Sequence, residues 1–300
     1  FNADFAYSVI LAEEFERVGS GIGGCVLHND IVVPYLYEFS TEEQKQRWIP
    51  KCITGEYSTA IAMTEPGTGS DLGNLQTRAV RDGDHYIING QKTFISNGLR
   101  SDLTIVACKT NPEAGHKGIS LIVVEKETPG FIRGKKLNKI GQLAGETTEL
   151  IFEDARVPVS NLLGEENKGF YYLMAKLQQE RLMCAIQALA AAEESLKITI
   201  DYVKQRTAFG KSISEFQNTQ FKIAEMATEV EIGRTFIDDL IVRHMEGQDI
   251  VTEVSMAKWW ITDMAKRLVS QCMQLHGGYG FMEEYAIARR YRDIAVTSIY

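Results

Sequence analysis

The chain has 300 residues, of which 44% are hydrophobic and 24% charged, a composition typical of a globular protein with about two or three domains. Its net charge of −8 at pH 7 argues against a nucleic-acid-binding protein, although locally gathered lysines and arginines could still hold an anionic ligand. No apolar run approaches the roughly 18 residues that a membrane-spanning helix requires.

The five cysteines are odd in number, widely separated and never arranged as Cys-x-x-Cys. This pattern predicts mostly buried, reduced thiols in a reducing compartment, and it favours neither a disulfide framework nor a zinc or other metal site. The cysteines are Cys25, Cys52, Cys108, Cys184 and Cys272.

Residues 1–58 have a helical pattern. The chain starts without Met, and apolar residues already recur at helical spacing from Phe5 onward. The Ser-Thr-Glu-Glu run at 40–43 is typical of a helix start with early acidic residues, and Pro34 and Pro50 punctuate the region. We expect a helical N-terminal domain over these residues, truncated at its start.

Residues 59–162 change character, because short runs rich in β-branched residues alternate with turn residues. No long helical pattern separates the runs, which favours an antiparallel β-barrel or sandwich over βαβ units. Asn-Gly between two such runs is a typical turn signal. The expected strands include 85–88, 104–107, 120–124 and 150–152, and the expected turns are Asp82-Gly83-Asp84, Asn89-Gly90, Asn97-Gly98 and Pro129-Gly130.

From residue 163 onward the helical pattern returns, with apolar residues at i, i+3 and i+4 spacing. We expect a C-terminal helical bundle over 163–300 that is truncated at its end. The fold class is therefore α+β and mostly α, in the order helical, β, helical. The three long helical segments lie near 167–205, 214–247 and 251–276, with Gly164, Gly210 and Gly277-Gly278 near their breaks.

The most informative segment is Ala-Met-Thr-Glu-Pro-Gly-Thr-Gly-Ser-Asp at residues 62–71, which follows the strand-like stretch 57–63. It combines a Pro-Gly turn with hydroxyls, carboxylates and backbone N–H groups. The hydroxyls and backbone N–H groups suit an oxygen-rich ligand such as a phosphate, a carbonyl or the edge of a flavin. A plain surface turn would explain the same residues.

Glu180 is a candidate general base. At about 100° per residue it shares a helix face with Leu177 and Cys184. Apolar surroundings disfavour the charged form of a carboxyl group and raise its pKa toward that of a useful base. A salt bridge to Arg181 or Lys176, or a solvated edge of the helix, is the alternative interpretation.

Three further segments could bind a ligand. The paired glycines of 274–281 would let a pyrophosphate approach the backbone, or would simply end a helix with a tight turn. In 206–211, Arg206 and Phe209 suit a phosphate and an adenine ring; alternatively, the basic residues Arg206 and Lys211 would only stabilise a helix C-terminus. In 94–98 an aromatic ring could stack on a flat cofactor or belong to the core. His276 has no metal-ligand spacing around it, which favours a structural role.

Taken together, these segments resemble the acyl-CoA dehydrogenase family in order and over essentially all of the chain. Residues 62–71 match the family's A-M-T-E-P-G-x-G-S-D segment, and 206–211 match R-x-A-F-G-K. Residues 274–293 match its Q-x-x-G-G-x-G-aromatic run, which is followed by an Arg and an Asp. One departure is minor: Asn74 stands where the family usually has a small residue, and Gly73 lies beside it.

The resemblance implies a helical N-terminal domain (1–58), a β-barrel or sandwich domain (59–162) and a four-helix C-terminal bundle (163–300). It also implies an FAD cofactor, a homotetramer built as a dimer of dimers, and a location in the bacterial cytoplasm or the mitochondrial matrix. The residues implied to bind FAD are Ile61, Ala62, Met63, Thr64, Gly69, Phe94, Ile95, Ser96, Arg206, Phe209, Gln217, Gln274, Gly277 and Gly278, with Arg206 and Gln217 reaching the FAD of a neighbouring subunit.

The resemblance also favours Glu180 as the base. Most members place the catalytic Glu in a C-terminal Y-E-G-T segment, and this chain stops at Tyr300, where that segment would begin. The long-chain and isovaleryl branches instead use a Glu followed by Arg on the first bundle helix, which Glu180 and Arg181 match. Residues 164–172 resemble the long-chain enzymes. Ser70, Tyr171, Gln178 and Arg181 are the implied contacts to the acyl-CoA substrate.

The implied reaction is α,β-dehydrogenation of an acyl-CoA thioester to the trans-2-enoyl-CoA. Glu180 removes the α-proton, the β-hydride goes to flavin N5, and electron-transfer flavoprotein receives the electrons. Two alternatives remain: an acyl-CoA oxidase that returns electrons to oxygen, and a catalytically silent flavin-binding homologue.

Overall fold

The structure is a computed structural model that describes residues 4–19 and 23–300. Contacts divide these residues into two compact units, each described by itself below. The sheet unit comprises residues 23–138 and 145–177, and the bundle unit comprises 4–19, 139–144 and 178–300. The three domains predicted from the sequence, with boundaries at 58 and 162, remain a prediction. The mostly helical α+β fold class is confirmed.

The sheet unit begins with short helices. Helix α4 has a capping box, in which the Gln44 N–H donates to Thr41 Oγ1 (3.2 Å) and the Thr41 N–H donates to Gln44 Oε1 (2.9 Å). This confirms the helix start predicted at 40–43. Pro34 lies in the first turn of α3, but Pro50 lies inside α4. These elements are α2 (Gly23–Val26), the π-helix η1 (Leu27–Val32), α3 (Val33–Phe39) and α4 (Glu42–Thr54).

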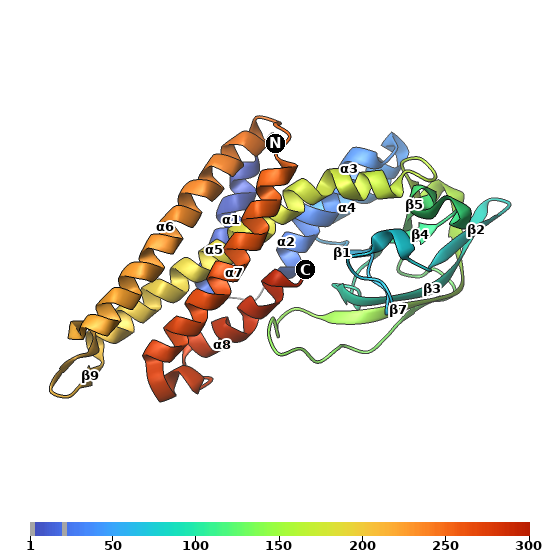
Figure 1. Cartoon of the computed structure of the whole chain (residues 1–300). Helices are drawn as coiled ribbons and strands as arrows, with labels where there is room; N and C mark the ends of the chain where they lie inside the picture. The colour runs from blue at the N-terminus through green and yellow to red at the C-terminus, as the bar shows by residue number, and fades with distance from the viewer. Residues whose placement is uncertain (1–3, 20–22) are drawn as a thin grey trace. The chain divides into compact units, whose positions relative to one another are not determined.

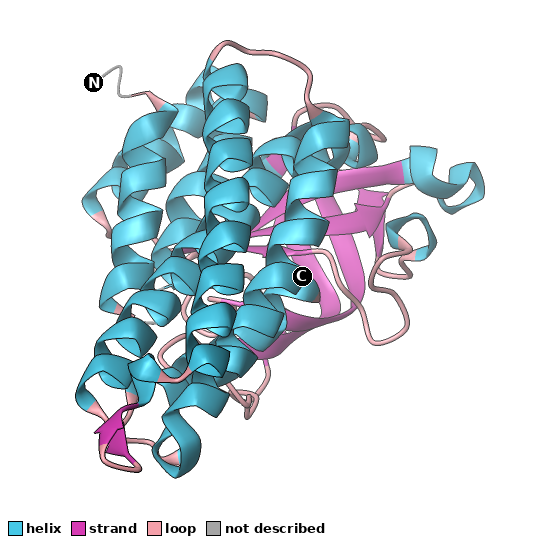
Figure 2. Ribbon diagram, turned by 60° about the vertical axis from the view of Figure 1, so that its left-hand side comes forward, coloured by secondary structure: helices cyan, strands magenta, loops and turns pink. Residues whose placement is uncertain are grey.

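One sheet follows, with the strand order β6-β7-β3-β2-β4-β5-β8 and β1 paired to β4. Figure 1 shows the long strands β3 and β7 side by side, and Figure 2 colours the strands magenta. The strands are β1 (Thr59–Ala62), β2 (Arg78–Asp82), β3 (His85–Ser96), β4 (Leu103–Lys109), β5 (Ile119–Glu125), β6 (Phe131–Arg133), β7 (Thr147–Pro158) and β8 (Leu162–Leu163), with 3₁₀ turns η2 (Leu72–Asn74), η3 (Pro112–Gly118) and η4 (Val159–Asn161) between them.

The sheet packs on both faces, which explains its unbroken runs of buried residues. Alternate residues of β4 and β5 belong to two different apolar clusters: Val106 and Ile122 to one, Ile105 and Leu121 to the other. The second cluster also contains Trp48 of α4, so the short helices cover that face. The predicted antiparallel pairing holds for most strands, but β1 runs parallel to β4, because the connection between them contains β2 and β3.

The turn predicted at Asn89-Gly90 is wrong. Both residues lie inside β3, where the register to β7 shifts. Asn89 Nδ2 donates to Asp154 Oδ1 (3.0 Å), and the Asp154 N–H donates to Asn89 Oδ1 (2.9 Å), so the asparagine bridges two strands instead of closing a turn. Gly90 has a φ of 151°, and a Cβ there would lie 2.7 Å from Thr77 Cα. The glycine therefore allows close approach of the backbone inside the sheet.

The bundle unit contains the long helices predicted from the sequence. In Figure 1, α6 and α7 lie side by side, and the short β9–β10 hairpin leads into α6. Its elements are α1 (Phe5–Val18), the part of α5 (Gly169–Gln205) from residue 178, β9 (Thr207–Ala208), β10 (Lys211–Ser212), η5 (Ile213–Glu215), α6 (Gln217–Met245), α7 (Val251–His276), η6 (Gly277–Phe281), α8 (Ala286–Asp293) and η7 (Ile294–Ser298).

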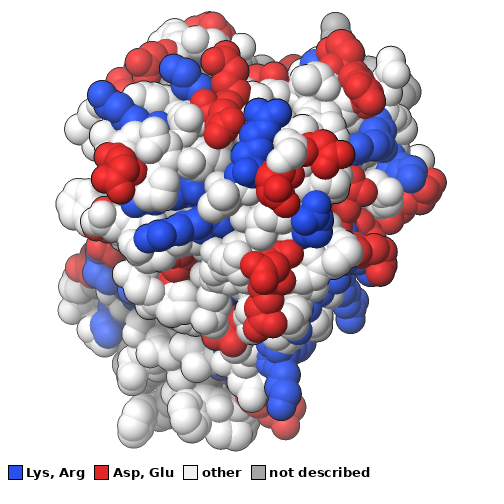
Figure 3. Space-filling view, turned by 90° about the vertical axis from the view of Figure 1, so that its right-hand side faces the viewer, with Lys and Arg blue, Asp and Glu red and all other residues white. Residues whose placement is uncertain are grey.

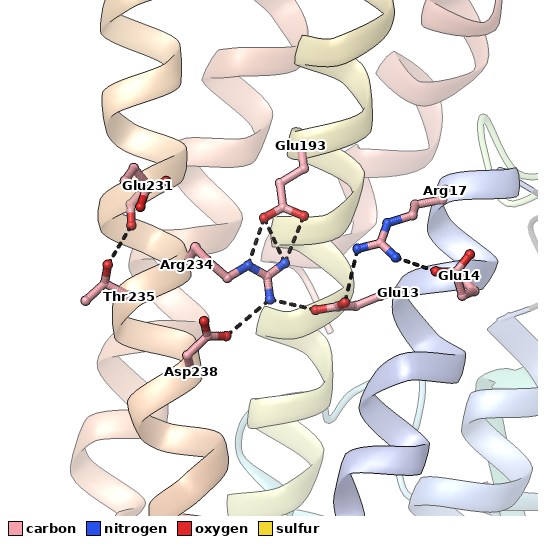
Figure 4. Close-up of polar contacts among 8 residues, drawn as sticks. All are labelled: Glu13, Glu14, Arg17, Glu193, Glu231, Arg234, Thr235 and Asp238. Carbon is pink, nitrogen blue, oxygen red and sulfur yellow. Dashed lines mark hydrogen bonds and ion pairs between the residues drawn. The ribbon is translucent and has the colours of Figure 1, made fainter.

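Arg234 ties three helices of this unit together (Figure 4). From α6 its guanidinium donates two bonds to Glu193 of α5, at 2.9 and 2.8 Å, and one to Glu13 of α1, at 2.6 Å. The fork geometry of arginine suits such a two-pronged contact. α1 is also capped from α8, because Arg290 donates to the carbonyl of Glu16 at 3.0 Å.

Within the described residues, no helix is both long and apolar enough to cross a membrane, and no cluster of His, Cys, Asp and Glu is placed to hold a metal ion. On the face drawn in Figure 3, basic and acidic side chains are interspersed.

The register shift at Gly90 is a β-bulge between β3 and β7, which Gly90→Ala tests. We expect a loss of about 1–3 kcal/mol in the free energy of unfolding, because the new methyl group overlaps the Thr77 backbone. Gly83→Ala is the matched control, since Gly83 also has a positive φ but no described atom lies within 4 Å of its Cβ position. Urea denaturation would show the difference; equal losses would contradict the bulge.

Candidate functional site

The segment 62–71 starts at the end of β1 and folds into a tight turn. The Glu65 N–H donates to the Thr68 carbonyl (2.8 Å), and the Thr68 N–H donates back to the Glu65 carbonyl (3.1 Å). Pro66 and Gly67 form the exposed tip. Gly69 and Ser70 follow on the surface. The run is thus a defined turn with accessible polar groups after it.

A buried ion pair holds this turn. Lys92 Nζ lies 2.9 Å from Glu65 Oε1, and the two side chains are 0% and 5% exposed. Lys92 also donates to the Met63 carbonyl at 2.9 Å. The Glu65 carboxylate accepts from the N–H groups of Gln76 and Thr77, at 2.5 and 2.9 Å. Each buried charged group is therefore paired and has at least two hydrogen bonds inside the unit.

The pKa values of this pair follow from its surroundings. Burial lowers the pKa of Lys92 from its ordinary value. Burial works to raise the pKa of Glu65, but the Lys92 charge and the hydrogen bonds to Gln76 and Thr77 together hold it below its usual range.

From the sequence alone, Glu65 is considered only as part of the candidate segment 62–71, and Lys92 is given no role. A signal for Lys92 was present, because the alternation of buried residues through Tyr86 and Ile88 places it on the inward face of β3. An inward lysine requires a carboxylate partner, and Glu65 is that partner.

Next to Lys92, the main chain of β3 also bonds to Thr64. The Thr93 N–H donates to the Thr64 carbonyl at 2.9 Å. Phe94 lies where the register between β3 and β7 shifts again, with a φ of 59° and a ring that is 69% exposed. A bulky residue rarely adopts a positive φ. A large aromatic ring exposed at the surface often marks a place where another molecule binds.

The other predicted FAD contacts in the sheet unit differ in exposure. Ile61, Ala62 and Ile95 have side chains buried in the two apolar clusters, so only their main-chain groups could meet a ligand. Met63 is half-buried and Ser96 is exposed. Tyr171, predicted to contact substrate, is 46% exposed and carries Lys168 over its ring at 5.5 Å.

The bundle unit has a cavity of about 580 Å³ at the end of α7. It brings together four residues that the sequence analysis singled out: Arg206, Gln274, Gly277 and Gly278. No described atom lies within 4 Å of a Cβ placed on either glycine, so both leave room on the cavity side. The remaining lining includes Tyr202, Ile213, Leu275, His276, Tyr279 and Met282.

Aromatic rings support this cavity. Tyr202 stacks on His276 with centroids 4.2 Å apart, and the guanidinium of Arg206 lies 5.3 Å from the centre of the Tyr279 ring. His276 is buried, and its Nδ1 lies 2.9 Å from the Cys272 carbonyl. Because a carbonyl only accepts, Nδ1 carries the proton. Burial lowers the pKa of His276.

Phe209 and Gln217 are not among the residues lining this cavity. Phe209 lies on the β9–β10 hairpin and is 95% exposed, with a φ of 53°. Gln217 is exposed at the first residue of α6. Both are free to meet another molecule.

The candidate base and its neighbours lie on α5 in the bundle unit. Glu180 is half-buried. Arg181 donates to Ser255 Oγ of α7 at 3.1 Å. Gln178 accepts from the Ile250 N–H (3.0 Å) and donates to the Gln248 carbonyl (3.1 Å), so its amide holds the loop before α7. In the sheet unit, Lys176 pairs with Glu38.

Comparison with known proteins gives the family. The acyl-CoA dehydrogenase N-terminal domain matches residues 1–56, the middle domain 60–155 and the C-terminal domain 167–300. The chain is 49% identical over 279 residues to the mitochondrial long-chain specific acyl-CoA dehydrogenase of Rattus norvegicus, covering 92% of this chain and 65% of the rat protein.

Solved structures agree. An acyl-CoA dehydrogenase from Geobacillus kaustophilus matches with a TM-score of 0.99 and 66% identity over 100% of this chain and 80% of that one. A chain in a structure of the electron transferring flavoprotein of Acidaminococcus fermentans matches with a TM-score of 0.95 and 38% identity, over 100% and 79%.

The chain therefore belongs to the acyl-CoA dehydrogenase family, a family of FAD flavoproteins. It spans about two thirds of the length of the rat enzyme.

The neutral state of His276 gives a pH prediction. The unfolded chain takes up a proton below pH 6.5, the ordinary pKa of histidine, whereas the folded chain resists it. The contribution of His276 to stability is therefore present above pH 6.5 and falls as the pH drops below it. An NMR titration should give a midpoint below 6.5, with His276→Gln to assign the signal; a midpoint above 6.5 would contradict the burial argument.

Proposed function

We propose that this protein catalyses the FAD-dependent α,β-dehydrogenation of an acyl-CoA thioester to the trans-2-enoyl-CoA. The observation that carries the proposal is the hydrogen bond from the Thr93 N–H to the Thr64 carbonyl, which ties Thr64 to the residue before Phe94. The family resemblance assigns both Thr64 and Phe94 to the flavin. The proposal is supported by membership of the acyl-CoA dehydrogenase family.

The residues present fit the cofactor. The exposed ring of Phe94 offers a flat face for stacking, and the hydroxyls of Thr64 and Ser96 stand on the same two segments. Met63 and Gly69 would line the same side, with main-chain groups of Ile61, Ala62 and Ile95.

The cavity of the bundle unit fits the phosphate end of a cofactor. Arg206 supplies a positive charge, Gly277 and Gly278 open the backbone, and Gln274 adds an amide. We assign this cavity, together with Phe209 and Gln217, to the FAD of a neighbouring subunit in a homotetramer built as a dimer of dimers. The near-complete exposure of Phe209 agrees with a partner that covers it.

In the proposed mechanism Glu180 accepts the α-proton of the bound thioester. FAD, when bound, supplies the acceptor for the β-hydride at N5. Ser70 holds the thioester end, and Tyr171, Gln178 and Arg181 contact the substrate. The hydrogen bonds of Gln178 and Arg181 to the loop before α7 and to α7 hold the turn of α5 that carries Glu180.

We further propose that electron-transfer flavoprotein receives the electrons, in the bacterial cytoplasm or the mitochondrial matrix. The likeness to a chain in a structure of the Acidaminococcus electron transferring flavoprotein supports this partner. An oxidase would instead consume oxygen without an added acceptor, and a catalytically silent homologue would bind FAD without being reduced by any acyl-CoA.

Glu180→Gln tests the base. We expect turnover of acyl-CoA to fall by about 10²- to 10⁴-fold while FAD stays bound, because the amide cannot accept the α-proton. The measurement is anaerobic bleaching of the flavin absorbance by acyl-CoAs of different chain length. Asp201→Asn, an exposed carboxylate-to-amide change on the same helix, is the control. Bleaching of the Glu180→Gln protein at the parent rate would refute the assignment.

Gly278→Ala tests the cavity. A Cβ at Gly278 meets no described atom, so stability should change by less than about 1 kcal/mol, while the methyl group narrows the cavity and weakens FAD binding. In Gly280→Ala the Cβ would lie 2.4 Å from the Met273 carbonyl, and we expect a stability loss of about 1–3 kcal/mol. Calorimetric titration of the apoprotein and thermal unfolding separate the two effects. Unchanged FAD affinity in Gly278→Ala would remove this cavity from the cofactor site.

A further inference from the structure

Lys92 and Glu65 bond not only to each other but also to main-chain groups around them. Lys92 and its neighbour Thr93 together bond to three consecutive residues of the segment that follows β1. Lys92 holds the Met63 carbonyl, its neighbour Thr93 holds the Thr64 carbonyl, and Glu65 itself is bound by Lys92. The main chain from Met63 to Glu65 is thereby fixed to one point of β3.

The same point of β3 carries Phe94. Lys92 is the last residue in register with β7 before the shift, and Phe94 adopts its positive φ within that shift. A change at Lys92 therefore acts on both sides of the candidate flavin site: on Thr64 through the Met63 and Glu65 contacts, and on Phe94 through the chain itself.

We propose that Lys92 and Glu65 are positioning residues for the flavin ring, which set the placement of Thr64 relative to Phe94. The inference rests on the proposed function. Neither side chain is exposed enough to touch a ligand, so both act through the backbone that they hold.

A simple packing role would not need charges here. Apolar side chains of similar volume often replace a buried ion pair without loss of stability. Such a replacement would fill the space but would leave the Met63 carbonyl and the N–H groups of Gln76 and Thr77 without their present partners. The charged pair therefore holds the main chain of the turn after β1 in one conformation.

The test uses Lys92→Met and, as a milder change, Glu65→Gln. In each variant we expect the FAD dissociation constant of the apoprotein to rise, on the order of tenfold to a hundredfold for Lys92→Met, which loses hydrogen bonds to a charged group. We also expect the visible circular dichroism of bound FAD to change, because the ring environment shifts. Binding is measured by quenching of flavin fluorescence.

Val157→Ala is the matched control, since Val157 is fully buried in the same sheet but takes part in none of the hydrogen bonds described for Lys92 and Glu65. Affinities are compared at temperatures equally far below each protein's thermal midpoint. The double variant Lys92→Met/Glu65→Gln gives a second comparison. If the pair positions the flavin ring, the double variant binds FAD as weakly as the single variants, even when its thermal midpoint returns to that of the parent protein.

The outcomes separate the two proposals. If the parent protein does not bind FAD, the proposed function fails. If the parent binds FAD and the variants differ from Val157→Ala in affinity and dichroism at matched stability, the positioning role is supported. If the variants equal Val157→Ala, or the double variant regains affinity together with stability, the pair is only structural and this inference is overturned.

Discussion

The buried ion pair between Lys92 and Glu65 is the constraint on which the candidate site depends. Removing two charges from water is costly, and the fold offsets that cost by giving each charged group several hydrogen bonds. Those bonds join three parts of the chain: Lys92 of β3, the stretch Met63–Glu65 and the stretch Gln76–Thr77. The turn after β1 is thereby held to β3, next to the exposed Phe94.

Different interactions shape the candidate site of the bundle unit. Arg234 and Arg290 fix α1 to its neighbours by charged hydrogen bonds, and the end of α7 is shaped by neutral groups. The stacked rings of Tyr202 and His276 support one wall of the cavity, and the glycines after His276 leave another wall bare. Burial keeps the histidine neutral, so Arg206 is the positive charge that the lining supplies.

Much of the fold could be predicted from periodicity. The runs at 104–107 and 120–124 lie within β4 and β5, and the helical segments predicted near 167–205, 214–247 and 251–276 correspond to α5, α6 and α7 with ends that differ by at most three residues. Prediction failed where a local signal was overridden by pairing: Asn89-Gly90 has the composition of a turn, but Asn89 bonds Asp154 on the neighbouring strand. The parallel contact of β1 with β4 was also beyond local pattern, because strand direction in a pair depends on the path of the chain between them.

The sequence by itself determined the order of helical and β segments and, through its motifs, the family resemblance, since both depend on residue types at fixed spacing. The roles of Glu180 and of the predicted FAD contacts remain predictions. Only the tertiary structure decided that Lys92 and Glu65 meet, that Ile61 and Ala62 are buried, and that Arg206 lies with Gly277 and Gly278 around one cavity. These facts join residues far apart in the chain, and side-chain burial and pairing exist only once the chain has folded.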